Sequence, residues 1–245
     1  MKTIAKALFI MALLVMGCRF SAAAALKGND EVMTIDYDVS AFVKVTTSLP
    51  FTVNFTMAEK YSCSVTAEED LMELLDIRVN GDELLLDRIN NSDLDSLLRT
   101  ALVVNLSAPS LDAVKVLGSG DFVFVSAMSG QKLKINLVGS GNVVFTRKSD
   151  YAEMEIVISG TGNVNVDSGS VVKMTATISG AGSLQSYCDV RELIAKITGS
   201  GNILANVNNT LRYDVTGTGK ISYYGNPNLR GKKVGRDVLE QLEDY

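Results

Sequence analysis

The chain has 245 residues, of which 47% are hydrophobic and 21% charged, and its formal net charge is −5. It contains no histidine, which excludes Ser-His and Cys-His nucleophile pairs and any histidine-ligated metal. Because the chain is acidic and has no basic run to neutralise phosphates, we expect no nucleic-acid partner. The length allows one or two domains with a real core.

Residues 1–25 are predicted to be a signal peptide rather than part of the fold. Lys2 and Lys6 make its start positive, and the apolar stretch that follows is too short to span a membrane. Cleavage either precedes Cys18, which ends a lipobox-like Val-Met-Gly-Cys, or follows the small residues that end at Ala25. We favour the lipidated Cys18. The protein is then exported as an outer-membrane lipoprotein, at the cell surface or in the periplasm, and meets the membrane only through its lipid.

Residues 26–110 are predicted to form a β-rich section that caps the part that follows. Apolar and polar residues alternate at period two, as in Phe51–Phe55, which is typical of a half-buried strand. Asn80-Gly81-Asp82 lies between two apolar runs and predicts a hairpin. Asp70–Asp76 is a candidate for a short helix that crosses from one sheet to the next. Asn90–Arg99 is polar and is predicted to be a loop or one helical turn.

A pair of glycines flanking one small residue recurs six times in the next section, residues 111–235. The first glycines of successive pairs are 21, 21, 20, 19 and 18 residues apart. A period near this length indicates stacked supersecondary units rather than one irregular globule. The glycines are Gly118, Gly120, Gly139, Gly141, Gly160, Gly162, Gly180, Gly182, Gly199, Gly201, Gly217 and Gly219.

Each unit is predicted to be a strand, a glycine corner, a second strand and a turn. Apolar residues alternate before the pair, as in Leu133–Leu137, and after it, as in Val143–Phe145. The second glycine of each pair takes the inward position between the two runs, where the backbone can bend or approach a neighbour closely. We therefore predict an all-β fold, a single-stranded β-helix or β-solenoid of six to seven coils of about 20 residues.

The residue between the glycines is Ser, Thr or Ala, and the residue after the pair is most often Asn. In a stack these positions would form a Ser/Thr row beside an Asn row. The rows either satisfy the amides of the corners or present a polar stripe to a ligand, and we favour the first interpretation. At the end of the chain, Gly235-Arg236-Asp237 is a degraded copy of the repeat, and residues 236–245 are predicted to be an acidic tail that covers the last coil.

The sequence predicts no catalytic residue, no cofactor site and no metal site. Outward positions such as Lys134, Glu155 and Arg212 are of mixed sign and scattered over several coils, which favours a solvated face over an active site. Cys63 and Cys188 have no metal or redox spacing, so we expect two buried free thiols.

Four tyrosines at or near turns are candidates for ligand contact, because aromatic rings stack on sugars and anchor protein partners. The alternative is that they pack at the edges of the coils. The four are Tyr151, Tyr187, Tyr223 and Tyr224.

The combined pattern resembles the bacterial family called putative auto-transporter adhesin, head GIN domain. The resemblance covers roughly residues 31–235 and rests on the lipoprotein-like leader, Asn80-Gly81 before Leu84–Leu86, Ala108–Leu111, the serial Gly-Ser-Gly-Asn units and the closing Tyr223–Pro227. It implies a β-helical fold similar to that of pectin lyases, a Bacteroidetes-type envelope protein, and an adhesin role with no established catalytic residues.

We therefore expect a non-enzymatic protein of the cell envelope, an adhesin or scaffold that recognises a glycan or a protein. Two alternatives stay open: a carbohydrate-active β-helix enzyme of the lyase or hydrolase kind, and a purely structural envelope protein.

Overall fold

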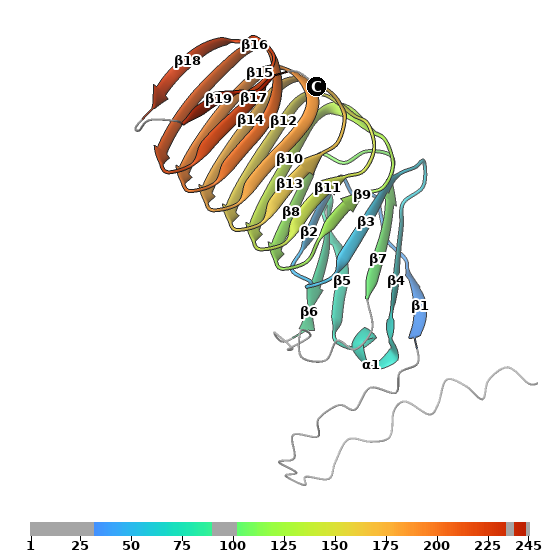
Figure 1. Ribbon diagram of the computed structural model, residues 1–245. Coiled ribbons are helices and arrows are strands. Elements are labelled where there is room, and N and C mark those ends of the chain that lie inside the picture. The colour runs from blue at the N-terminus through green and yellow to red at the C-terminus, as the bar shows by residue number, and fades with distance from the viewer. Residues whose placement is uncertain (1–31, 90–101, 234–237, 244–245) are drawn as a thin grey trace, which may run out of the picture.

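The computed structural model describes residues 32–89, 102–233 and 238–243. Within these residues the chain forms nineteen strands and one short helix. The strands stack into the predicted β-solenoid, which is flattened so that each coil contributes one strand to each of two walls (Figure 1). The predicted signal peptide with Cys18, the polar segment Asn90–Arg99 and the degraded repeat Gly235–Asp237 lie outside the described residues.

The first wall contains the longer strands, which are parallel and pair in register. In stacking order they are β6 (Glu83–Arg88), β2 (Lys44–Thr47), β8 (Ala113–Gly118), β10 (Met128–Gly139), β12 (Ser149–Gly160), β14 (Gly169–Gly180), the second halves of β15 (Ser183–Gly199) and β16 (Asn202–Gly217), and β18 (Asn228–Lys233).

The second wall contains shorter parallel strands. In stacking order they are β7 (Val103–Ala108), β3 (Thr52–Met57), β9 (Phe122–Phe124), β11 (Asn142–Phe145), β13 (Asn163–Val166), the first halves of β15 and β16, β17 (Lys220–Tyr224) and β19 (Leu239–Gln241).

Antiparallel strands extend both walls at the N-terminal end of the stack. β5 (Leu75–Asn80) forms the predicted hairpin with β6, and Gly81 in its turn has a φ of 65°. β4 (Ser62–Glu68) pairs with β7, and β1 (Val32–Tyr37) pairs with β4. The helix α1 (Glu69–Met72) connects β4 to β5 and so crosses from the second wall to the first. It is shorter than the predicted Asp70–Asp76, because Leu75 and Asp76 already belong to β5.

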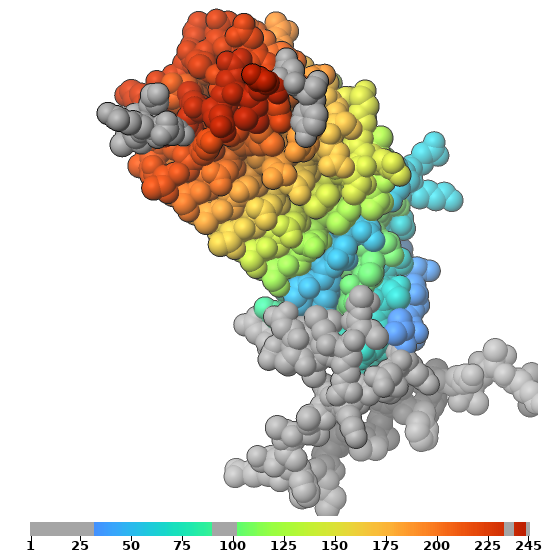
Figure 2. Space-filling view, in the orientation of Figure 1, coloured from blue at the N-terminus to red at the C-terminus, as the bar shows by residue number. Residues whose placement is uncertain are grey.

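The first coil of the chain lies inside the stack rather than at its end. β2 pairs with β6 on one side and β8 on the other, and β3 pairs likewise with β7 and β9. Strands that are later in sequence therefore cover an earlier coil, and Figure 2 shows a blue band enclosed by green ones. Both walls run without a break from this section into the glycine repeats.

The predicted inward residues form columns between the two walls. Ile135, Ile156 and Ala176 occupy equivalent positions of β10, β12 and β14 and are at most 1% exposed. On the second wall the rings of Phe124 and Phe145 stack with their centroids 4.0 Å apart. One continuous core thus runs through the solenoid, as expected when each coil buries its apolar edge on its neighbours.

Main-chain hydrogen bonds join each glycine corner to the next. The Gly118 carbonyl accepts from the amides of Ser140 and Gly141 at 2.9 and 3.1 Å, and the same pair of bonds recurs at later corners. The first glycine of every pair has a positive φ, from 114° at Gly118 to 131° at Gly160. The amides of the middle residue and of the second glycine are therefore satisfied by carbonyl groups and not by the Ser/Thr row. The other row does satisfy amides after the pair, since the Asn142 and Lys220 amides donate to Asp121 Oδ1 and Asn202 Oδ1.

The predicted Asn row forms over three coils. The Asn142 side-chain amide donates to Asp121 Oδ1 at 2.9 Å, and the Asn163 side-chain amide donates to Asn142 Oδ1 at 3.1 Å. At the C-terminal end, β18 and β19 add a further coil, so residues 239–241 of the predicted acidic tail form a strand on β17.

We predict that Ile156→Lys lowers the free energy of unfolding by several kcal/mol, because it places an unpaired charge at a fully buried position. The matched control is Val157→Lys at the next, outward position of the same strand, which should change stability by less than about 0.5 kcal/mol. Urea denaturation followed by circular dichroism measures both. Equal midpoints for Ile156→Lys and the parent would contradict the inward assignment.

We predict that Gly162→Ala destabilises the protein by about 1–3 kcal/mol, because overpacking costs this much. An added Cβ would overlap the carbonyl oxygen of Gly141 in the preceding coil. Thr161→Ala, at the exposed position between the glycines, is the control and should leave the melting temperature nearly unchanged. If both variants have the melting temperature of the parent, the close approach of the corners is not the reason that a glycine is required at position 162.

Candidate functional site

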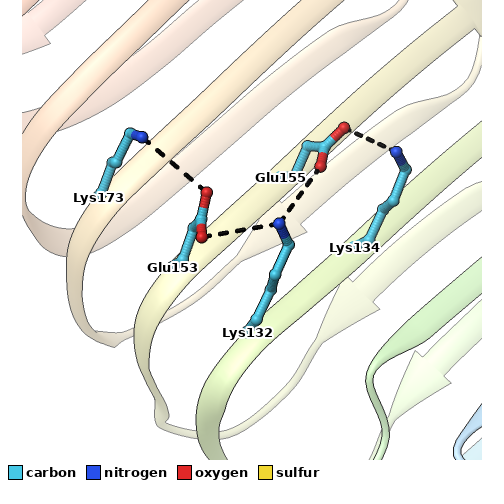
Figure 3. A network of polar contacts seen from close by, with 5 residues as sticks. All are labelled: Lys132, Lys134, Glu153, Glu155 and Lys173. Carbon is cyan, nitrogen blue, oxygen red and sulfur yellow. Dashed lines mark hydrogen bonds and ion pairs between the residues drawn. The ribbon is translucent and has the colours of Figure 1, made fainter.

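The outer surface of the first wall carries charged residues that pair with one another. Lys134 Nζ donates to Glu155 Oε1 at 2.8 Å, and Lys132 Nζ lies 3.6 Å from Glu153 and 3.9 Å from Glu155 (Figure 3). Lys173 reaches Glu153 from the following coil at 4.0 Å. The mixed charges that looked scattered in the sequence thus meet as neighbours on adjacent coils. Exposed pairs of this kind contribute little stability each.

Further ion pairs lie at both ends of this wall. Arg212 Nε is 3.1 Å from Glu192, and Lys44 Nζ is 2.8 Å from Asp82. The hydrogen bond between Lys44 and Asp82 lowers the pKa of the aspartate and raises the pKa of the lysine. The described part of the first wall therefore balances much of its own charge.

A shallow hollow of about 370 Å³ lies on the first wall near its C-terminal end. Apolar atoms make up most of its surface, and the charged side chains around it are of both signs. Its lining residues are Ile194, Ala195, Lys196, Arg212, Tyr213, Asp214, Arg230 and Gly231. The lining gathers three basic side chains, Lys196, Arg212 and Arg230, beside one acid, Asp214, and so does not supply the pair of carboxylates that a glycoside hydrolase uses.

Most of the outer surface of the second wall is different, because amide and hydroxyl side chains replace the charges. The exception is its C-terminal end, where Lys220 of β17 pairs with Glu240 of β19 at 2.6 Å. In β3, β7, β9, β11 and β13, and in β15 and β16 as far as Tyr187 and Asn206, all fully described, every outward side chain is uncharged. The next outward residue of β15 is the exposed Asp189, which accepts a hydrogen bond from the Asn206 side chain at 2.8 Å. We call the uncharged surface the amide face. Its amide side chains are Asn54, Asn105, Asn142, Asn163, Asn165, Gln185, Asn202 and Asn206.

Residues of the amide face stand in rows that follow the stacking direction. One row contains Val144, Asn165, Gln185 and Leu204, which are paired in register on β11, β13, β15 and β16. In another part of the face, the Asn54 side chain donates to Asn105 Oδ1 at 3.1 Å. The row of Asn165 was not predicted from the sequence, although the outward position of Asn165 in the period-two alternation was available as a signal.

Tyr187 is the exposed aromatic residue beside this row, with 47% of its surface accessible. It follows Gln185 by two residues, so both side chains leave the strand on the same side. The pairing of β15 with β16 is irregular here, with a register shift between Ser186 and Asp189. Such bulges re-aim side chains and are common near functional sites.

The other three candidate tyrosines are less accessible. Tyr151 and Tyr223 are only 3% and 5% exposed because they occupy inward positions of β12 and β17. A ligand-contact role for these two does not agree with their burial, and packing within the coils describes them better. Tyr224 is half-buried on the outer side of β17. Tyr187 is thus the most exposed of the four candidate tyrosines.

Both described cysteines are buried and free of disulfides, as expected. Burial raises the pKa of Cys63 to about 12 and that of Cys188 to about 11. Neither thiol therefore forms a nucleophilic thiolate at neutral pH. Within the described ranges no group of His, Cys, Asp and Glu residues could hold a metal ion. The one described helix is too short to cross a membrane.

These features define a repeat protein of the β-solenoid class with an extended, uncharged side surface. The chain belongs to the family described as putative auto-transporter adhesin, head GIN domain, whose model matches residues 41–227. No curated protein matches the chain.

Three solved structures of similar fold come from Bacteroides and Parabacteroides species. A putative adhesin from Bacteroides fragilis has 19% identity and a TM-score of 0.75, over 88% of this chain and 95% of that one. A putative lipid binding protein from Parabacteroides distasonis has 19% identity and a TM-score of 0.75, over 88% and 98%. A putative adhesin from Parabacteroides merdae has 21% identity and a TM-score of 0.74, also over 88% and 98%. At these identities the likeness shows the fold alone.

Proposed function

We propose that the protein is a non-enzymatic adhesin of the bacterial cell envelope that holds a glycan or a protein on the side of its solenoid. The observation that carries this proposal is the amide face, an uncharged surface that runs over seven strands of the second wall. Solenoids commonly bind through extended surfaces of this kind. Membership of an adhesin family supports the same function.

Binding without catalysis fits the chemistry of the side chains. A glycoside hydrolase needs two carboxylates beside the scissile bond, whereas Glu153, Glu155 and Glu192 of the first wall are paired with basic residues on adjacent coils. The sequence has no histidine to act as a general base. A surface of amides and hydroxyls can hold a ligand by hydrogen bonds but offers no group to break a bond.

We predict that the purified protein is retained on an array of bacterial and host glycans and matrix proteins, and that it releases no new reducing ends or unsaturated sugars from the glycans it holds. Retention is read by fluorescence, and turnover by a reducing-end assay and by ultraviolet absorbance of the products. Turnover would show that the protein is a carbohydrate-active enzyme and not an adhesin. Failure to retain any ligand would support a purely structural envelope protein.

We further propose that the protein is exported and anchored through a lipid on Cys18. The proposal rests on the sequence, where this cysteine follows a short apolar stretch and a small residue. A lipid would place the solenoid at the membrane without a spanning segment.

Cys18→Ala is expected to release the protein from the membrane fraction or to block its processing, because the lipid attachment atom is lost. Membrane fractionation and gel mobility in the native host measure the effect. Ser21→Ala, within the alternative cleavage region, is the control and should behave like the parent. Unchanged fractionation and mobility of Cys18→Ala would favour cleavage near Ala25 and a freely soluble protein.

A further inference from the structure

We infer that the amide face binds an uncharged polysaccharide, and that Asn165, Gln185 and Tyr187 form its central contact. This inference rests on the proposed adhesin function and names the ligand class and the residues for it. The ligand is defined by its chemistry, as a neutral glycan chain of repeated hydroxyl-rich sugars.

The charge distribution points to a neutral ligand. At the border of the amide face, Asp121 and Asp189 accept hydrogen bonds from Asn142 and Asn206, and Lys220 pairs with Glu240. The amide face itself carries no charged side chain at the outward positions of β3, β7, β9, β11 and β13, or of β15 and β16 as far as Tyr187 and Asn206, all of which lie in the described part of the chain. It therefore offers no ionic partner to a uronic acid, a sulfated sugar or a phosphate. Side-chain amides both donate and accept hydrogen bonds, and sugar hydroxyls do the same, so the two surfaces are matched in polarity.

Two amides at the centre of the face are available for a ligand. Asn165 and Gln185 are directly paired on β13 and β15, which places them about 4.8 Å apart along the stack. Neither side chain makes a hydrogen bond or ion pair with another residue in the described ranges, unlike the bonded pair of Asn54 and Asn105. Their donors and acceptors are therefore satisfied by water or by a ligand.

The neighbours of this pair give the site an amphipathic character. Val144 and Leu204 extend the row on either side and are half-buried. Tyr187 adds an exposed ring next to Gln185, at the bulge of β15. Sugars have apolar C–H faces as well as hydroxyl edges, and an aromatic ring with a polar tip stacks on such a face. Amides beside an exposed aromatic ring therefore match the two kinds of sugar surface.

The repeat of the fold adds a geometric argument. Outward residues recur at the strand spacing of about 4.8 Å along the stack, and the sugars of an extended polysaccharide advance by a similar length. A glycan chain that lies along the stack therefore meets hydrogen-bonding groups at each coil. A single sugar would use one row position and bind weakly, whereas a chain gains from several contacts at once.

The experiment is affinity electrophoresis of the purified protein in gels that contain one polysaccharide each. The neutral probes are xylan, mixed-linkage β-glucan and galactomannan, and the anionic probes are alginate and polygalacturonate. We expect at least one neutral probe to retard the protein, and the dissociation constant to be nearly the same at low and high salt, because no ion pairs form that salt could screen. The anionic probes should not retard it.

Tyr187→Ala should weaken binding to the neutral probe by about tenfold, and the double variant Asn165→Ala with Gln185→Ala should weaken it at least as much. Tyr187→Trp should retain binding, because it keeps an aromatic ring. Lys196→Ala, on the outer face of the first wall but in the same strand β15, is the matched control and should bind like the parent. Circular dichroism melts establish that all variants are folded.

The outcomes separate this inference from the proposed function. Retention by an anionic probe or a matrix protein, with Tyr187→Ala equal to the parent, overturns the inference and leaves the adhesin function in place. Retention by a neutral probe that the Tyr187 and Asn165/Gln185 variants do not change also overturns it, because the site then lies elsewhere. If no neutral probe retards the protein and the glycan and matrix-protein array retains none of it, both the inference and the proposed adhesin function are overturned.

Discussion

The hydrogen bonds between successive glycine corners determine how the coils stack. One carbonyl, that of the first glycine, accepts from two amides of the next coil, as Gly118 does from Ser140 and Gly141. The second glycine must pass so close to the preceding corner that a side chain would overlap its backbone. These contacts place each corner in the same position relative to the corner of the preceding coil. Because the corner is constant, the strands on both sides of it stay in register.

The register of the strands then determines which side chains become neighbours in the rest of each coil. Inward positions become continuous apolar columns, and outward positions become rows of side chains that face one another at the strand spacing of about 4.8 Å. A residue in such a row is surrounded by its equivalents in the coils above and below. The chemistry of a row is therefore a property of the repeat rather than of any one residue, and the two walls differ because their rows hold different residue types.

Much of this architecture could be predicted, since the glycine spacing and the period-two alternation are local in sequence. The enclosed first coil was not predicted, because its corner at Ser48–Phe51 has no glycine pair. It nevertheless packs against Gly120, whose missing side chain leaves room for the Leu49 and Phe51 carbonyls. The amide pair of Asn165 and Gln185 and the bulge at Tyr187 depend on which strands become neighbours. The burial of Tyr151 and Tyr223 in the core was not predicted either, because these tyrosines were chosen only for their position near turns.

The difference between the walls follows from the electrostatics of stacking. Two like charges at the strand spacing repel by about 1 kcal/mol even in water, which favours alternation of sign along a row, as in Lys132, Glu153, Lys173 and Glu192 on successive coils. Arg212 and Arg230, which are paired in register, are an exception. An alternating row neutralises itself and cannot present the same group at every coil. Neutral amides carry no such penalty and can even bond to their neighbours, as Asn142 and Asn163 do. Uncharged side chains can therefore repeat one kind of contact along a solenoid without electrostatic repulsion, and the amide face is built from such side chains.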